Sequence, residues 1–549
     1  MQSAARGRVV PATLAVLAVL AASLGAVGLA RADDGLTHRS VTVSGVPLTE
    51  VRATTAQATA GATSPVSVAP TAGTTPTAGA TPTAGTPTTA GTAGRRPGVV
   101  VAHGFAGSRR LMTPLADTLA RHGYVVVLLD FAGHGANPAR LPGAGQDTGA
   151  GTAALAADLD TAVGYLRSRP DVDPARIGLV GHSMGAGAVA RYAVAHPEIV
   201  ATVAISLPGA DPVPAGGDRP RALLLLVGGN EFAGFRAAAT EAVRRAGPAG
   251  DRRAVVVPGV EHISILFAGR THAEMTSWLD ARLAPPPGPR APARPTGYLA
   301  PAGLLLLGFA LGLQPLARVL LGAGGRRASA RTRLPLALLA TVLATGLGAV
   351  LPRLLPFDRL PLAVGNYLIG LLAVTGALLL GIARLPRLGR VDPAATGSDQ
   401  RPASGAGRPG TLRLAIAAVL LAGYAVAAVA VPISLGFTSA APTGARWWLL
   451  PIVTAAAWLF LLGAERITGG GPGRLVPYVV AVAGVTVAAL VGVAPGFVLL
   501  VVPLFAILLA WQFGWATALG RLAAPAWLIA LPGAVLLGWP IATTLPLTG

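Results

Sequence analysis

The 549-residue sequence predicts an α/β domain with a mainly parallel sheet and helices on both faces, followed by an all-α transmembrane bundle. Residues 95–284 alternate short apolar runs with helical stretches, which is typical of a parallel sheet that helices cover on both sides. Residues 298–549 contain about eight apolar spans of roughly 20 residues, the length that a bilayer core requires. The charge composition changes at the same place. Residues 1–297 hold 26 arginines and 19 acidic residues, whereas residues 298–549 hold 17 arginines and four acidic residues.

Composition excludes several kinds of site. The chain has no cysteine, which excludes disulfides, thiol nucleophiles and cysteine-ligated metals, and no motif in it predicts a metal or a cofactor. All 43 basic residues are arginines, and the net charge is +20. A basic balance can serve nucleic-acid binding. Because no basic module with interleaved aromatic residues is present, we expect no nucleic-acid partner and assign the arginines to membrane loops.

The N-terminal region predicts an export signal followed by a short β segment. Arg6 and Arg8 precede an apolar run, so residues 1–32 are a signal sequence or a signal anchor. The Ala30-Arg31-Ala32 triplet has the small-x-small form of a cleavage site, but the apolar run is longer than most signal cores. Cleavage and retention therefore both stay open. The alternation within residues 33–53 predicts one or two strands.

Two low-complexity segments flank the α/β domain. Residues 54–94 consist mostly of Thr, Ala, Gly and Pro and have almost nothing to bury, so we expect them to be disordered. Residues 285–297 form a Pro-rich linker. Between these segments we expect strands at 98–102, 124–130, 177–181, 200–206, 222–228 and 253–258. The helices are expected at 111–122, 155–169, 184–195, 235–246 and 272–283.

Loop charges predict the orientation of a multi-pass protein in the cell membrane. Loop 322–333 carries four arginines and loop 384–411 carries five, whereas the intervening loops are nearly uncharged. The positive-inside rule places these basic loops in the cytoplasm and the α/β domain outside it. Arg6 and Arg8, ahead of the first span, indicate the same orientation independently.

The Gly181-His182-Ser183-Met184-Gly185 motif predicts a nucleophile elbow. It follows a predicted strand and opens a predicted helix, the setting that the G-x-S-x-G turn requires. The backbone N–H of Met184, at the helix N-terminus, can stabilise an oxyanion. His103-Gly104-Phe105 follows another predicted strand, and the N–H of Phe105 is the expected second oxyanion donor, although His103-Gly104 can also be only a tight turn.

These motifs resemble those of the α/β-hydrolase superfamily, close to its dienelactone-hydrolase-like and serine-aminopeptidase-like members. The segments that carry the resemblance are residues 103–105, 130–135, 181–185 and 257–262. The family's chain order of nucleophile, acid and histidine implies Ser183, Glu231 and His262. Neutral imidazole is a suitable base near pH 7, and a carboxylate on its other nitrogen fixes the tautomer and stabilises the imidazolium.

Other titratable residues near these motifs are expected to be structural or to point elsewhere: His134, His182, His272, Glu261, Asp158 and Asp160. Of these, Asp158 and Asp160 are expected on a solvated helix face. Asp211 and Asp218 could replace Glu231 only if loop 207–221 folds over the site. That short loop leaves no room for a helical lid, so a shallow, open site is expected.

The favoured function is a membrane-tethered serine hydrolase that cleaves a small-molecule or lipid carboxylic ester, thioester or amide. One alternative is a hydrolase-like sensor or binding domain for the membrane bundle, although the complete Ser–His–acid set argues against it. Another is a transporter with an accessory domain. Ion-coupled transport is disfavoured because the four acidic residues after 298 fall in loops or at a helix end and no histidine is present there.

Overall fold

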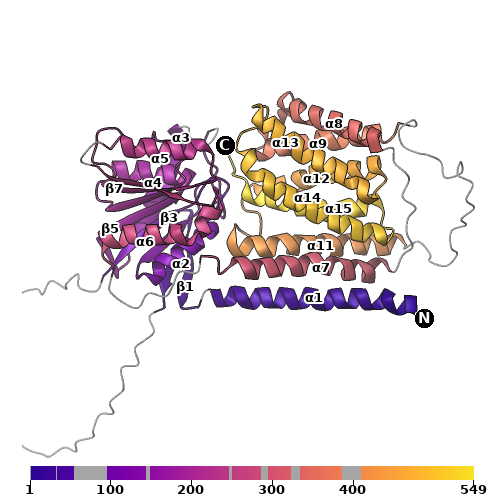
Figure 1. Cartoon of the computed structure of the whole chain (residues 1–549), viewed down its shortest axis with the longest axis horizontal. Coiled ribbons are helices and arrows are strands. Elements are labelled where there is room, and N and C mark those ends of the chain that lie inside the picture. The colour runs from indigo at the N-terminus through magenta and orange to yellow at the C-terminus, as the bar shows by residue number, and fades with distance from the viewer. Residues whose placement is uncertain are drawn as a thin grey trace, which may run out of the picture.

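The computed structural model describes residues 2–32, 34–54, 95–143, 149–246, 250–285, 295–322, 334–385 and 410–549. Figure 1 shows an α/β domain at one end of a bundle of long helices that run side by side. Residues 54–94, expected to be disordered, and residues 285–297, expected to be a Pro-rich linker, lie almost entirely outside the described residues.

An eight-stranded sheet forms the centre of the α/β domain, in the order β1-β2-β4-β3-β5-β6-β7-β8. Strands β3 to β8 are parallel to one another, whereas β2 is antiparallel to both of its neighbours, β1 and β4. The strands are β1 Leu36–Val43, β2 Val46–Ala53, β3 Arg96–Ala102, β4 Val125–Leu129, β5 Val172–His182, β6 Ala201–Ile205, β7 Ala222–Gly228 and β8 Asp251–Val257. The predicted mainly parallel sheet is confirmed.

The segment 33–53, expected to precede the domain, is part of its sheet. Strand β2 pairs with β4, with Leu48 opposite Leu129 and Val51 opposite Val126. Residues 54–94 therefore connect two strands of one sheet rather than joining a separate segment to the domain. The pairing was not predictable locally, because it depends on contacts between residues about 80 positions apart.

Helices cover both faces of the sheet, as predicted. They are α2 Thr113–Arg121, α3 Gly149–Arg167, α4 Met184–Ala195, α5 Ala233–Arg244 and α6 Gly269–Leu283. Because successive side chains of a strand point to opposite faces, Val99 and Val101 pack toward α2 and α6, whereas Val100 and Ala102 pack toward α3 and α4. Short 3-10 helices are η1 Arg109–Met112, η2 Ser264–Phe267, η3 Leu351–Arg353, η4 Pro356–Arg359 and η6 Gly471–Arg474.

The helical bundle follows. Its helices are α7 Leu299–Leu321, α8 Leu334–Val350, α9 Gly365–Ile382, α11 Thr411–Gly436, α12 Arg446–Thr468, α13 Leu475–Leu490, α14 Val498–Arg521 and α15 Ala526–Thr544. Within the described part of the chain, nine helices are long and apolar enough to cross a membrane, which suggests a multi-pass membrane protein. Eight of them lie after residue 298, the number expected there.

The ninth candidate span belongs to α1 Gln2–Ala32, which lies beside α7 (Figure 1). The two helices approach closely at glycines. A Cβ atom at Gly25 would lie 2.7 Å from the carbonyl oxygen of Pro301, and one at Gly308 would lie 2.8 Å from that of Ala18. Small residues of this kind let transmembrane helices pack backbone to backbone. Helix α1 is therefore an integral part of the packing in this structure.

The bundle and the α/β domain contact each other through the chain segment after α15. The N–H of Leu547 donates to the carbonyl oxygen of Gly133 at 2.8 Å, and the N–H of Leu141 donates to that of Leu547 at 2.9 Å. Arg446, at the start of α12, donates from Nη2 to the oxygen of Gly133 at 2.6 Å. The loop that follows β4 is thus bound to the bundle mainly through backbone atoms.

Candidate active site

Ser183 lies in a strained turn between β5 and α4. Its φ is 53° and its ψ is −116°, a combination that L-residues rarely adopt. A Cβ atom at Gly181 would lie 2.2 Å from the oxygen of Gly185, and one at Gly185 would lie 2.6 Å from the oxygen of Ala102. Both glycines are therefore required by close backbone contacts. The N–H of Ser183 donates to the oxygen of Ile205 at 2.8 Å, which holds the turn against β6.

Glu231 and His262 lie together at the ends of β7 and β8. The Oε2 atom of Glu231 is 3.5 Å from Nδ1 of His262, and both side chains are buried. The other carboxylate oxygen, Oε1, accepts hydrogen bonds from the Ser206 hydroxyl at 2.6 Å and the Gly228 N–H at 3.0 Å. The carboxylate is therefore fixed in position and has one oxygen left for the imidazole.

Ser206 is a site residue that the sequence reasoning missed. It follows β6 directly and has a positive φ of 56°, so it occupies a second strained turn at the same edge of the sheet as Ser183. No motif marks it. The only signal in the sequence is its place at the end of a predicted strand, where open α/β sheets gather their functional groups.

The structure brings His262 next to the serine turn without joining the two side chains. Among the described residues, no hydrogen bond links the Ser183 hydroxyl to His262. Instead, Nε2 of His182 lies 2.9 Å from the carbonyl oxygen of His262, and the two imidazole rings are 4.8 Å apart. Catalytic hydrogen bonds are often long or absent before substrate binds. The roles of Ser183, Glu231 and His262 stay predictions.

The loop after β3 lies against the serine turn, where an oxyanion donor is expected. A Cβ atom at Gly104 would lie 3.0 Å from Cβ of Ser183, so only glycine permits this approach. Both ring nitrogens of His103 contact backbone atoms, which fixes the loop. Nε2 accepts from the Phe131 N–H at 3.1 Å, and Nδ1 lies 2.8 Å from the Gly104 oxygen. This arrangement places Phe105 beside the turn that contains Met184. Their oxyanion roles stay predictions.

The competing histidines are structural, as expected. Burial lowers the pKa of the His134 and His182 imidazoles well below the ordinary value, so both are neutral at pH 7. Burial lowers the pKa of His272 to about 4, and its two ring nitrogens are paired with the Thr118 hydroxyl and the Leu266 carbonyl oxygen. None of these rings is paired with a carboxylate.

The competing acids do not reach His262 either. Glu261 accepts hydrogen bonds from the backbone N–H groups of Ile263 and Ser264, so it shapes its own loop. The Asp211 side chain is 91% exposed and 3.7 Å from Arg245, and Asp218 is exposed as well. Loop 207–221 therefore does not supply an alternative acid at the site.

The expectation that Asp158 belongs to a solvated helix face is wrong. Its side chain is buried and accepts a hydrogen bond from the Ala132 N–H at 2.8 Å, and burial raises its pKa to about 6. The reason is that α3 turns this residue toward the loop after β4, whose backbone needs an acceptor. Asp160 does face solvent, where it accepts from the Tyr192 hydroxyl.

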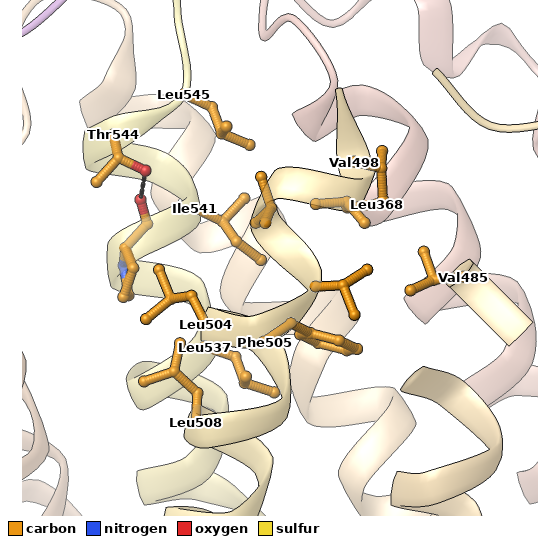
Figure 2. Close-up of a pocket in the computed structure, with 13 residues that line it drawn as sticks. Leu368, Val485, Val498, Leu504, Phe505, Leu508, Leu537, Ile541, Thr544 and Leu545 are labelled. Atoms are coloured by element: carbon orange, nitrogen blue, oxygen red, sulfur yellow. Dashed lines mark hydrogen bonds between the residues drawn. The ribbon is translucent and has the colours of Figure 1, made fainter. Parts of the chain in front are cut away.

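Neither a metal cluster nor the apolar crevice of the bundle adds to this site in the described part of the chain. No group of three or more His, Asp or Glu side chains that could hold a metal is found within the described ranges. Figure 2 shows an apolar crevice between α14 and α15, whose side chains, including Leu504, Leu537 and Ile541, point toward one another. Its volume is about 30 Å³, which is room for about one water molecule, and neither Ser183 nor His262 lines it. This crevice is therefore not a substrate site.

Part of the α/β domain is similar to known proteins. Residues 94–220 match the model of the family described as serine aminopeptidase, S33. Two uncharacterized proteins of Mycobacterium tuberculosis, from strains CDC 1551 and H37Rv, are each 39% identical over 104 residues, which is 19% of this chain. The matched residues span about a third (34%) of the length of these curated relatives.

Solved structures with a similar arrangement include two hydrolases. A dienelactone hydrolase from Anabaena variabilis has a TM-score of 0.30 and 19% identity, covering 45% of this chain and 99% of its own. An esterase from Pyrococcus furiosus has a TM-score of 0.31 and 19% identity, covering 45% and 93%. At such scores neither likeness decides the function.

The parallel sheet, the strained serine turn and the family match define an α/β-hydrolase domain. Domains of this family are typically serine hydrolases. The chain joins this α/β-hydrolase domain, of which residues 94–220 match the S33 family model, to an all-helical region that contains eight of the candidate membrane spans found in the described residues.

Proposed function

We propose that the protein is a membrane-tethered serine hydrolase that cleaves a carboxylic ester, or a related thioester or amide, through an acyl-serine intermediate. The observation that carries the proposal is the strained Ser183 turn beside the buried His262–Glu231 pair. A strained turn exposes the serine hydroxyl at the end of a strand, and a paired imidazole is the base that such a hydroxyl needs.

In the first half-reaction, the Ser183 hydroxyl oxygen attacks the carbonyl carbon while Nε2 of His262 takes the hydroxyl proton. The carboxylate of Glu231 keeps the other ring nitrogen protonated and stabilises the imidazolium. The negative charge on the former carbonyl oxygen is met by the N–H groups of Phe105 and Met184. When the tetrahedral intermediate collapses, His262 returns its proton to the leaving alcohol.

In the second half-reaction, a water molecule replaces the alcohol. His262 takes a proton from this water, which attacks the acyl carbon, and the proton then passes to the departing Ser183 oxygen. The products are a carboxylic acid and the free enzyme. No cofactor enters this sequence, since every proton moves between the substrate, water and residues of the chain.

An activity-based probe tests the proposal. The full chain in detergent should be labelled at Ser183 by a fluorophosphonate, which reacts with activated serines, and Ser183→Ala should abolish both labelling and ester hydrolysis. Ser40→Ala, on the exposed strand β1, is the matched control and should keep both. Labelling of Ser183→Ala as strongly as wild type, or no labelling of wild type, would contradict the proposal.

We also propose that the hydrolase domain is extracytoplasmic and that α1 is retained as an anchor. The basic loops support the orientation, and the close packing of α1 on α7 supports retention. Protease added to intact cells should remove the domain, and the N-terminal sequence of the purified chain should begin ahead of Ala30. Full protection of the domain, or an N-terminus at Asp33, would overturn the corresponding half of this proposal.

A further inference from the structure

One part of the sheet edge that carries Ser183 lies against the helical bundle. Two loops at this edge, one after β3 and one after β4, are hydrogen-bonded to it. The Ser108 hydroxyl donates to the oxygen of Phe437 at 2.5 Å, and the Thr443 hydroxyl donates to the oxygen of Gly135 at 3.0 Å. The bundle therefore covers part of the edge where the proposed chemistry takes place.

One aromatic side chain of the bundle reaches the loop beside the serine. Phe497, which directly precedes α14, packs its ring on that of Phe105, with the centroids 4.7 Å apart and the planes at 79°. Phe105 follows Gly104, whose backbone lies against Ser183. Phe497 is half-buried in this contact. Phe105 therefore lies between Phe497 of the bundle and the glycine that contacts Ser183.

The opposite side of the same edge is apolar and exposed. Phe232, the residue after Glu231, is 55% exposed, and Ile263, the residue after His262, is 37% exposed. Large apolar side chains next to a proposed site are a cost in water unless a ligand covers them. Apolar groups therefore lie on both sides of the proposed catalytic residues.

Within the described ranges of the hydrolase domain, loop 207–221 is the loop after the serine turn that could form a lid. Loop 207–221 packs down on the domain, because Leu207, Ala210 and Val213 are buried against α4 and α5. On the bundle side, the described contact comes from the segment between α13 and α14, where Phe497 packs against Phe105.

Resting on the function proposed above, we propose that Phe497 forms one wall of the substrate site and determines its specificity. The site takes amphiphilic esters with an apolar chain, which approach from the membrane surface. The chain passes between Phe497 on one side and the Phe232–Ile263 side on the other, with the ester carbonyl at Ser183. The hydrolase domain and the bundle therefore build this site together.

Chain-length selectivity of the full chain in nanodiscs tests the inference. The measured quantity is the ratio of kcat/KM for p-nitrophenyl decanoate to that for p-nitrophenyl butyrate. Phe497→Ala should lower this ratio about tenfold, since apolar contacts of this size discriminate by about one to two orders of magnitude. Phe357→Ala is the matched control, because this phenylalanine packs on Gly370 within the bundle, and its ratio should stay at the wild-type value.

A second variant separates substrate contact from loosened docking. Thr443→Val removes the hydrogen bond to Gly135 and leaves Phe497 in place, so the ratio should not change. A loss as large as that of Phe497→Ala would overturn the inference, and so would an unchanged ratio in Phe497→Ala. If wild type neither reacts with a fluorophosphonate nor hydrolyses either ester, the proposed function itself is wrong and the inference fails with it.

Discussion

The sheet edge that carries Ser183 has two halves, and they differ in their contacts with the bundle. The loops after β3 and β4 form a docked half, bound to the bundle by hydrogen bonds of 2.5 to 3.0 Å such as those of Ser108 and Leu547. The loops after β7 and β8 form an open half, which carries Glu231 and His262 beside exposed apolar side chains. In this half the proposed catalytic pair is 3.5 Å apart.

The difference separates two tasks of the proposed mechanism. The docked half offers the backbone N–H of Phe105, one of the two proposed oxyanion donors, and such donors act best when they are fixed in advance. The open half offers the groups that exchange protons, and a distance of 3.5 Å is at the outer limit of a hydrogen bond. We therefore expect this pair to tighten when substrate covers the open half, while the docked half stays as it is.

The largest expected effect is the loss of activity when the carboxylate of the open half, Glu231, is replaced. Glu231→Gln should reduce kcat for ester hydrolysis on the order of 10⁴-fold, because the amide cannot stabilise the imidazolium. The melting temperature should change little, since the amide oxygen can still accept from Ser206. The control is Glu241→Gln on α5, whose partners Arg244 and Arg245 lie on the surface, and it should keep full activity.

The second largest effect is expected in the docked half, where a substitution of Gly133 should reduce stability. This residue has a φ of +77°, and a Cβ atom there would lie 2.4 Å from the oxygen of Leu547. Gly133→Ala should lower the free energy of unfolding by about 3 kcal/mol, since backbone strain and a displaced tail add. Gly216→Ala is the matched control, with a φ of +72° but open space around it, and should cost about 1 kcal/mol. Equal losses in thermal unfolding would show that the tail contact contributes nothing.

A smaller effect should appear in the pH dependence of stability, away from both halves. Burial lowers the pKa of His272 to about 4, so only the unfolded chain takes up its proton as the pH falls from 6.5 to 4. The free energy of unfolding therefore keeps its full value above pH 6.5 as far as His272 is concerned. About 3 kcal/mol of it is lost by pH 4. His272→Gln should therefore show a flatter decline of melting temperature between these pH values. Parallel curves for wild type and variant would contradict this assignment.

The smallest effect is expected at the acids that the sequence left open. Asp211→Asn and Asp218→Asn should each change kcat/KM less than twofold, because both side chains are exposed and the charge they carry is screened by water. Ester hydrolysis under the conditions used for Glu231→Gln measures this. If either variant lost more activity than Glu231→Gln, the acid would lie in loop 207–221.

Features with a strict local requirement were predictable from the sequence. Strands β4, β6 and β7 are buried along their whole length, so their positions follow from the sequence to within a few residues. The turn at Ser183 was predictable because Gly181 and Gly185 are both needed by backbone contacts. Glu231 and His262 came from the family's chain order and lie together in the structure.

Features that depend on distant backbone atoms were not predictable. The contact between Leu547 and the loop after β4 joins positions about 400 residues apart through N–H and C=O groups, which every residue has. Asp158 was misjudged for the same reason, since its partner is the N–H of Ala132 rather than a recognisable side chain. The docking of Phe497 on Phe105 likewise joins two aromatic residues that no shared motif connects.

The contact of Leu547 with the loop after β4 also fixes an order of events during synthesis. Residues 545–549 follow α15, so the ribosome makes them about 260 residues after the hydrolase domain ends. At about 5–20 residues per second, this delay is roughly 13–50 s, long enough for the domain to fold before its partner segment exists. The contact of Leu547 with the domain therefore forms after the contacts of Phe437, Arg446 and Phe497 have become possible.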